Sequence, residues 1–192
     1  MRVDRHTPMV LALWNDVDPA HEAAYNDWHA GEHVPERLTV PGMEWGARYR
    51  ALQTHLTRPV YLTLYGLHDA AVLESDPYQR LLAQPTPTSQ RMRPLLRNVV
   101  RAVYALDGEA GPWTEPVLHL FDTTNVGSEP VWPGSAVRGR CLPSVKPLPW
   151  LQAGQGGYLA PQAVVWLPGS AVPVDWADRG DVYQQLHFME PS

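Results

Sequence analysis

The order of apolar patterns in the first hundred residues constrains the fold more than any other feature of this chain. Residues 8–17 form an apolar run of strand length, and residues 43–52 and 59–67 are predicted to be two further strands. A helix is predicted to begin at Asp18-Pro19, because Asp is a good N-cap and Pro is favoured at the first helical position. The chain therefore starts with a strand, a helix and two strands.

The next segments complete a recognisable order. We expect the first helix to end before Pro35, since the residue that precedes a proline is disfavoured in helical conformation. A second helix is predicted over residues 69–84, a further helical turn over 88–96 and a closing strand over 97–106. The order β-α-β-β-α-β is the ferredoxin-like arrangement, an antiparallel sheet with both helices on one face.

The second half repeats the strand patterns and lacks the helical ones. Three runs echo the first, third and closing strands of the first half: residues 116–122, 163–169 and 181–189. Between the first two lies a Gly- and Pro-rich stretch, 127–158, that cannot be a long helix. We predict an α+β fold with a ferredoxin-like domain over residues 1–107 and a degenerate, helix-poor second half over 108–192. The two would form an α/β barrel-like pair of sheets, with 107–113 as linker; an unrelated β-rich extension is the alternative.

Composition excludes several classes of protein. The net charge is −5 and Lys and Arg are scattered, so nucleic acid is not an expected partner. Cys141 is the only cysteine, which rules out an intrachain disulfide and a multi-cysteine metal site. The N-terminus lacks an apolar signal region, and no run approaches the roughly 20 apolar residues of a membrane span. We therefore expect a cytoplasmic protein that does not enter a membrane.

One local pattern resembles a zinc site. Residues 29–33 read H-A-G-E-H and satisfy H-x-x-E-H, in which two histidines four residues apart share a helix face and bind zinc. A third ligand is needed, and the helix is expected to end two residues later at Pro35. We treat the match as accidental and predict no metal and no organic cofactor.

The whole segment 25–50, YNDWHAGEHVPERLTVPGMEWGARYR, carries a more specific pattern. It resembles the EthD-like branch of the dimeric α/β-barrel superfamily, over about residues 7–106. Members of that branch have a W-Y-D-x-x-H-x-P-x-R-L type stretch at the end of the first helix and then a P-G-F-x-x-x-x-R-Y strand. This chain departs from the pattern at His29, Ala30 and Met43, where Tyr, an acid and Phe are usual, and it retains His33.

The resemblance implies a fold and a kind of ligand. Sheets of such proteins pair to form a barrel, and a pocket between the sheet and the helices admits small, often aromatic, molecules. Relatives include cofactor-free oxygenases, decarboxylases, cyclases and isomerases. Two such halves in one chain could close the barrel internally, and a homodimer is the other possibility.

His33, Arg48 and Tyr49 are the candidate catalytic residues. A histidine titrates near neutral pH and can both take and give a proton, and His33 is predicted near a helix end whose dipole would favour its protonated form. Arg48 and Tyr49 are adjacent on a strand and face opposite ways, so only one of them can hold a substrate oxygen. The structural alternative for His33 is a bond to a loop carbonyl that fixes the turn.

Several aromatic and histidine side chains are candidates for substrate binding. They are Trp14, Trp28, His29, Trp45, Tyr65 and His119. His119 and His187 lie on strands of the second half and could face the barrel lumen, although satisfied interior histidines are the more common explanation of such a pattern.

We therefore predict a cofactor-independent enzyme that acts on a small apolar or aromatic carbonyl compound. The reaction would be proton transfer, as in a lyase or isomerase (decarboxylation, cyclisation or isomerisation), or oxygenation of a phenol by a cofactor-free monooxygenase. The alternative is a non-enzymatic ligand-binding or assembly module of the same fold. An enclosed pocket of about 300 Å³ or more at His33 would favour the enzyme, and a filled interior would favour the module.

Overall fold

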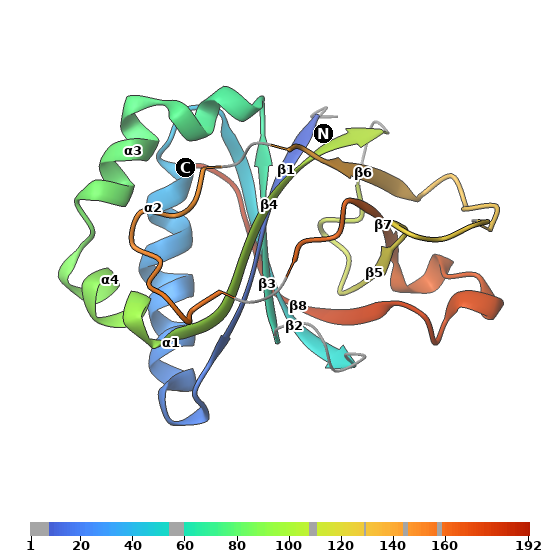
Figure 1. The fold of residues 1–192 in the computed structure, drawn as a ribbon, viewed down its shortest axis with the longest axis horizontal. Coiled ribbons are helices and arrows are strands. Elements are labelled where there is room, and N and C mark those ends of the chain that lie inside the picture. Colours follow the sequence, from blue (N-terminus) through green and yellow to red (C-terminus); the bar gives the residue numbers. More distant parts are fainter. Residues whose placement is uncertain (1–7, 54–59, 108–110, 129, 144–145, 157–158) are drawn as a thin grey trace.

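Eight strands close into one antiparallel barrel in the computed structural model, which describes residues 8–53, 60–107, 111–128, 130–143, 146–156 and 159–192 (Figure 1). Around the barrel the order is β1-β3-β2-β8-β5-β7-β6-β4. The strands are β1 Met9–Val17, β2 Met43–Gln53, β3 Tyr61–Leu67, β4 Leu96–Asp107, β5 Val117–Asp122, β6 Val137–Cys141, β7 Ala163–Pro168 and β8 Asp181–Met189. The barrel closes within a single chain, which is one of the two routes that the sequence left open.

Helices cover the outer face of β1 to β4 (Figure 1). In chain order they are the 3₁₀ turn Pro19–His21, α1 Glu22–Trp28, the π turn His29–His33, α2 Val34–Leu38, the 3₁₀ turn Ala70–Glu74, α3 Asp76–Ala83, α4 Pro87–Met92 and the 3₁₀ turn Arg93–Leu95. The described part of the second half has only the 3₁₀ turns Gly169–Ala171 and Val174–Trp176. The molecule is therefore of the α+β class, with its helices gathered on one side. None of the described helices has the length and apolar character needed to cross a membrane.

Each half contributes four neighbouring strands in the same spatial order. The first half is arranged β4-β1-β3-β2 and the second β8-β5-β7-β6, and β2·β8 and β4·β6 pairs join them. Seven of the eight strands fall where the apolar patterns predicted them. The exception is β6, Val137–Cys141, which lies inside the Gly- and Pro-rich stretch.

The first helix does not end before Pro35, and that expectation was wrong. Asp18 caps its start, as predicted, by accepting a hydrogen bond from the Ala20 amide at 2.8 Å. The helix then runs on to Leu38 through one π turn, in which the Val34 amide donates to the His29 carbonyl. In a regular α-helix the ring of Pro35 would clash with the carbonyl four residues earlier, and the wider turn relieves that clash.

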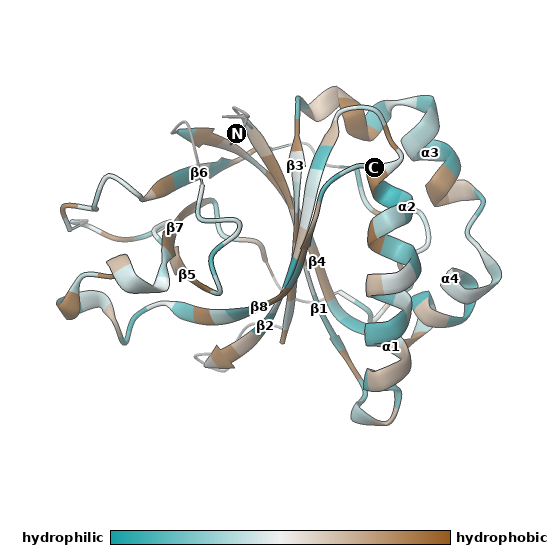
Figure 2. Cartoon of the chain, turned by 180° about the vertical axis from the view of Figure 1, so that it is seen from behind, coloured by the Kyte–Doolittle hydropathy of each residue, from teal (hydrophilic) through white to brown (hydrophobic). Residues whose placement is uncertain are grey.

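Alternate residues of each strand divide between the barrel lumen and its outer surface. The lumen is filled mainly by aromatic side chains: Trp14, Trp45, Tyr49, Tyr104, Trp113, Trp166 and Tyr183. Trp113 is 6% exposed, so the predicted linker supplies part of this core. A second cluster fills the space between β1–β4 and the helices. Figure 2 shows the matching pattern, in which α1 and α2 alternate between apolar and hydrophilic residues.

Candidate functional site

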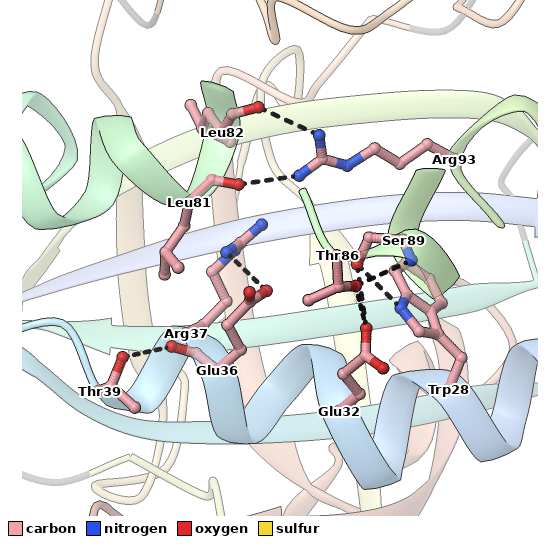
Figure 3. A network of polar contacts seen from close by, with 10 residues as sticks. All are labelled: Trp28, Glu32, Glu36, Arg37, Thr39, Leu81, Leu82, Thr86, Ser89 and Arg93. Carbon is pink, nitrogen blue, oxygen red and sulfur yellow. Dashed lines mark hydrogen bonds and ion pairs between the residues drawn. The ribbon is translucent and has the colours of Figure 1, made fainter. Parts of the chain in front are cut away.

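Polar contacts join the long helix of residues 22–38 to the start of α4 beside it (Figure 3). Glu32 accepts a hydrogen bond from the Thr86 hydroxyl, and Trp28 donates its indole N–H to Ser89 Oγ at 3.1 Å. Arg93 donates to two carbonyls near the end of α3, those of Leu81 and Leu82, each at 3.1 Å. Glu32 thus points toward α4, whereas His29, the first residue of the π turn, points toward Thr63 of β3.

His29 and His33 form a packed pair beneath this helix. Their ring centroids are 4.9 Å apart, and His33 also lies 4.6 Å from the Trp28 ring. His29 Nε2 is 3.5 Å from Thr63 Oγ1, while the Nδ1 atoms of both histidines are buried without a hydrogen-bond partner. His33 Nδ1 therefore makes no hydrogen bond to a loop carbonyl, the kind of contact that the structural alternative assigned to an N–H of His33.

The histidine pair borders a small enclosed cavity of about 40 Å³. Its other lining residues include Trp14, Asn15, Trp28, Thr63, Tyr65, Arg93 and Trp150. This volume is enough for water but well below the roughly 300 Å³ of a typical small-molecule site. The predicted residues Trp14, Trp28, His29, His33 and Tyr65 thus come together, around a space too small for an aromatic substrate.

Both histidines are held neutral by their surroundings. Burial lowers the pKa of His29 well below its usual range, and the neighbouring His33, Arg48 and His187 act in the same direction because each would repel a protonated His29 ring when it is itself protonated. Burial also lowers the pKa of His33 well below its usual range, with Arg37, Arg93 and Arg48 adding to the effect. The expectation that a helix end would favour protonated His33 was wrong, because His33 lies in mid-helix and loses its hydration.

A larger, open cleft of about 590 Å³ lies beside this pair, and Arg48 lines it. Arg48 is 1% exposed, and its guanidinium carbon lies 4.6 Å and 4.7 Å from the ring centroids of Tyr25 and Tyr61. One terminal nitrogen, Nη2, donates to Asn26 Oδ1 at 2.7 Å, and Nε has no partner. The cleft is therefore bordered by a buried cation that packs against two neighbouring aromatic rings.

His187 lies opposite Arg48 on the neighbouring strand, and a β-bulge puts it there. Arg48 pairs with His187, but the next residue, Tyr49, pairs with Gln185, so Leu186 is the extra residue. Gln185 donates to the Tyr49 hydroxyl inside the lumen, whereas His187 lines the outer cleft. Without the bulge, residues 185 and 187 would share a face. The expectation that His187 faces the lumen was therefore wrong.

His187 is also neutral at physiological pH. Burial, assisted by the charge of Arg48, lowers its pKa to about 4. Its Nε2 atom is buried without a partner. Sequence reasoning did not name His187 as a site residue, since the bulge that redirects it leaves no signal in the pattern of the strand.

The other predicted residues lie elsewhere. Tyr49 faces the lumen, opposite to Arg48 as expected, and its hydroxyl donates to the Trp113 carbonyl at 2.9 Å. Trp45 stacks on Trp113 in the same lumen. His119 lies on the outer face of the second half, where its ring stacks on Phe121, so it does not face the lumen. Of the two candidates for holding a substrate oxygen, only Arg48 borders an open space.

The H-x-x-E-H histidines lack further metal ligands nearby. Within the described ranges, no three side chains of His, Cys, Asp or Glu are grouped so that they could hold a metal ion. Glu32 of this motif is bonded to Thr86 on the far side of the helix.

The fold defines a class of protein: a closed α+β barrel with a helical layer on one side. The chain is similar to a solved structure described as a crystal structure of an anthrone oxidase-like protein. The TM-score is 0.53, over 96% of this chain and 93% of the other, at 11% sequence identity. No protein-family model matches the sequence, and no curated protein matches it. At this identity the similarity establishes the fold alone.

Proposed function

We propose that this protein is a cofactor-independent enzyme that moves a proton at an acidic carbon of a small aromatic or apolar carbonyl compound. The observation that carries the proposal is the cross-strand pair in the open cleft: a buried, positively charged Arg48 beside a neutral His187. A neutral histidine can take a proton, and a fixed cation can stabilise the negative charge that then develops on the carbonyl oxygen.

The two side chains would assist each other. The charge of Arg48 is one cause of the low pKa of His187. An oxyanion that forms on Arg48 offsets that charge, so it raises the pKa of His187 as the proton arrives. A base that strengthens while the substrate loses its proton needs no metal for the step.

His33, predicted as the acid or base, has a different place in this proposal. It borders the small cavity and not the cleft, so we assign the first proton transfer to His187. His29 and His33 are proposed as a buried neutral pair behind the site, and Trp28 and Tyr65 as its walls. Tyr49, Trp14, Trp45 and His119 are proposed as packing residues.

The reaction after deprotonation depends on the substrate. An enolate or phenolate can be reprotonated at another carbon, can cyclise, or can react with dioxygen, and a carboxylated substrate can lose carbon dioxide. The similar structure is described as anthrone oxidase-like. An anthrone is an aromatic ketone with an acidic methylene group, so a reaction of such a compound fits the same first step.

We also propose the finer family assignment. The segment 25–50 supports the EthD-like branch, and the shared strand order supports two ferredoxin-like halves over residues 1–107 and 108–192. Because the barrel closes within the chain, a homodimer is not needed to complete it.

The test is the exchange of acidic C–H protons. Anthrone and other enolisable aryl ketones are incubated with the protein in D₂O, and loss of the proton signal is followed by NMR. His187→Gln should slow the catalysed exchange by about 10²-fold or more, the usual contribution of a general base. His68→Gln, at an exposed histidine outside the cleft, is the matched control.

The rival function is a ligand-binding module without catalysis. The small volume at His33 favours it, because a nearly filled interior is what a structural histidine pair would leave. A module binds the ketones without exchanging their protons. If every compound that binds exchanges its protons at the uncatalysed rate, the protein is a ligand-binding module.

A further inference from the structure

The cleft beside Arg48 has features that define the charge of its ligand. The rings of Tyr25 and Tyr61 lie 4.6 Å and 4.7 Å from the guanidinium carbon and 5.0 Å from each other, so both pack against the same side of the group. The N–H bonds of a guanidinium lie in one plane, so its hydrogen bonds to a ligand are made at the edge of the group. Edge-on contact is the geometry in which a guanidinium binds a carboxylate or another planar oxyanion.

The described residues give Arg48 no carboxylate partner. Its hydrogen bonds go to neutral groups, the amide of Asn26 and the Tyr25 hydroxyl, and its Nε atom is buried without a partner. Glu22, one of the two acids that line the cleft, accepts a hydrogen bond from the Tyr61 hydroxyl and pairs with Arg50 at 3.3 Å. A buried charge without a partner is costly, so an anion that reached Arg48 would gain more there than at the surface.

The charges around the cleft limit how negative that anion can be. Its lining carries two acids, Glu22 and Asp27, and two arginines, Arg48 and Arg50, while His187 is neutral. These formal charges sum to zero. One added negative charge is matched by Arg48, whereas a second would have no cation free of a partner and would face both acids.

The remaining lining favours an apolar body. Leu186 and Ala30 border the same space, and its volume of about 590 Å³ accommodates a small aromatic molecule. We propose that the cleft binds a planar monoanion (a carboxylate, phenolate or enolate) on a small aromatic or apolar body, with the anionic group edge-on to Arg48. This inference rests on the proposed function for the role of the cleft and adds the charge and shape of its ligand.

The experiment compares three probes of one shape and different charge. Benzoate is a monoanion, benzamide its neutral counterpart, and phenyl phosphate is mostly a dianion at pH 8. Binding to the intact chain is measured by calorimetry, and the His187 ring is followed by NMR. We expect benzoate to bind at least 10-fold more tightly than either other probe and to raise the pKa of His187 from about 4.

Variants locate the interaction. Arg48→Gln should weaken benzoate binding at least 10-fold, and Arg91→Gln, the same change at an exposed arginine on α4, should leave it unchanged. If Arg48→Gln does not fold, the relative affinities of the three probes for the unmodified protein still test whether the cleft prefers a monoanion. Benzamide binding as tightly as benzoate, phenyl phosphate binding more tightly, or no benzoate binding at millimolar concentration would each overturn the inference.

The outcome is separable from that of the proposed function. Selective benzoate binding without proton exchange would support the monoanion ligand and contradict the proposed enzyme function. Proton exchange that depends on His187, without selective benzoate binding, would support the enzyme function and contradict the inference that the ligand is a monoanion.

Discussion

The two halves of the barrel share one strand order and cover it in different ways. On the first half, helices α1 to α4 lie over the sheet (Figure 1), and the buried polar side chains of His29, Arg48 and Thr63 occupy part of the space beneath them. On the second half, loops and 3₁₀ turns enclose an apolar cluster instead: Phe121, Trp132, Val165, Leu167 and Trp176. The same sheet therefore carries a polar site only where a helix faces it.

The reason lies in what each cover can hold in place. A helix presents side chains at fixed spacing, and the π turn sets His29 and His33 side by side over the sheet. Described loops of the second half contain many prolines, which limit backbone hydrogen bonding, so their contribution is mainly apolar. The difference teaches that the shared strands supply the scaffold, and that polar side chains such as Arg48 and His187 border an open cleft only where a helix covers the sheet.

The largest effect is expected in the lumen, which belongs to both halves. Trp166 is fully buried there, and Trp166→Ala should lower the free energy of unfolding by about 3–5 kcal/mol. Trp132→Ala, in the loop cover of the second half, should cost less because loops can collapse into the space. Urea denaturation measures both. An equal or larger loss at Trp132 would contradict the view that the lumen dominates.

The histidine pair makes the first half sensitive to acid. The pKa values of His29 and His33 are lowered in the folded state, so the unfolded chain binds more protons below about pH 6.5. The free energy of unfolding should therefore fall as the pH falls, by about 1.4 kcal/mol per pH unit for each proton taken up, or ~2.7 for both. Urea denaturation between pH 7.5 and 5 measures the slope.

Substitution separates these two residues from the other acid-sensitive groups. His29→Gln and His33→Gln should each reduce the slope by about one proton. His21→Gln, at an exposed histidine of the same half, should leave it unchanged. A slope that none of the three variants alters would place the acid sensitivity outside the pair.

Most strands of both halves could be predicted from the sequence, because apolar and polar residues alternate along a strand that has one face in a core. The strand β6 was missed since Val137–Cys141 is short, contains Gly and two Arg, and lies among prolines. This segment is a strand because it pairs with β4 on one side and β7 on the other, and those long-range hydrogen bonds cannot be read from its own residues.

The site was less predictable for two physical reasons. The continuation of the helix through Pro35 depends on the π turn, which tertiary packing stabilises and local propensity does not. The position of His187 depends on a bulge opposite Arg48, and one extra residue moves every following side chain to the other face. The helix and strand patterns named Arg48 and His33, but only the three-dimensional pairing shows which histidine borders the cleft.

Matched glycines test how alike the two halves are inside the lumen. A Cβ added at Gly66 would lie 2.2 Å from the Trp45 indole, and one at Gly139 would lie 2.4 Å from the Trp166 ring. Gly66→Ala and Gly139→Ala should each cost about 1–3 kcal/mol by overpacking. Thermal or urea unfolding measures the losses. A normal stability for either variant would mean that its half accommodates extra volume and that the lumen is not equally packed.

The smallest effect concerns the contacts that hold the helical cover in place. Thr86 donates a hydrogen bond to Glu32, and its oxygen accepts one from the Ser89 amide at the start of α4 (Figure 3). Thr86→Ala removes both interactions and should cost about 1–2 kcal/mol. Thr114→Ala, at an exposed position before β5, is the control and should cost less than about 0.5 kcal/mol. Because Glu32 lies within the π turn, Thr86→Ala should also change the NMR signals of the His29 and His33 rings. Unchanged signals would mean that contacts with the sheet alone hold His29 and His33 in place. The contacts with α4 would then contribute to stability without positioning the two histidines.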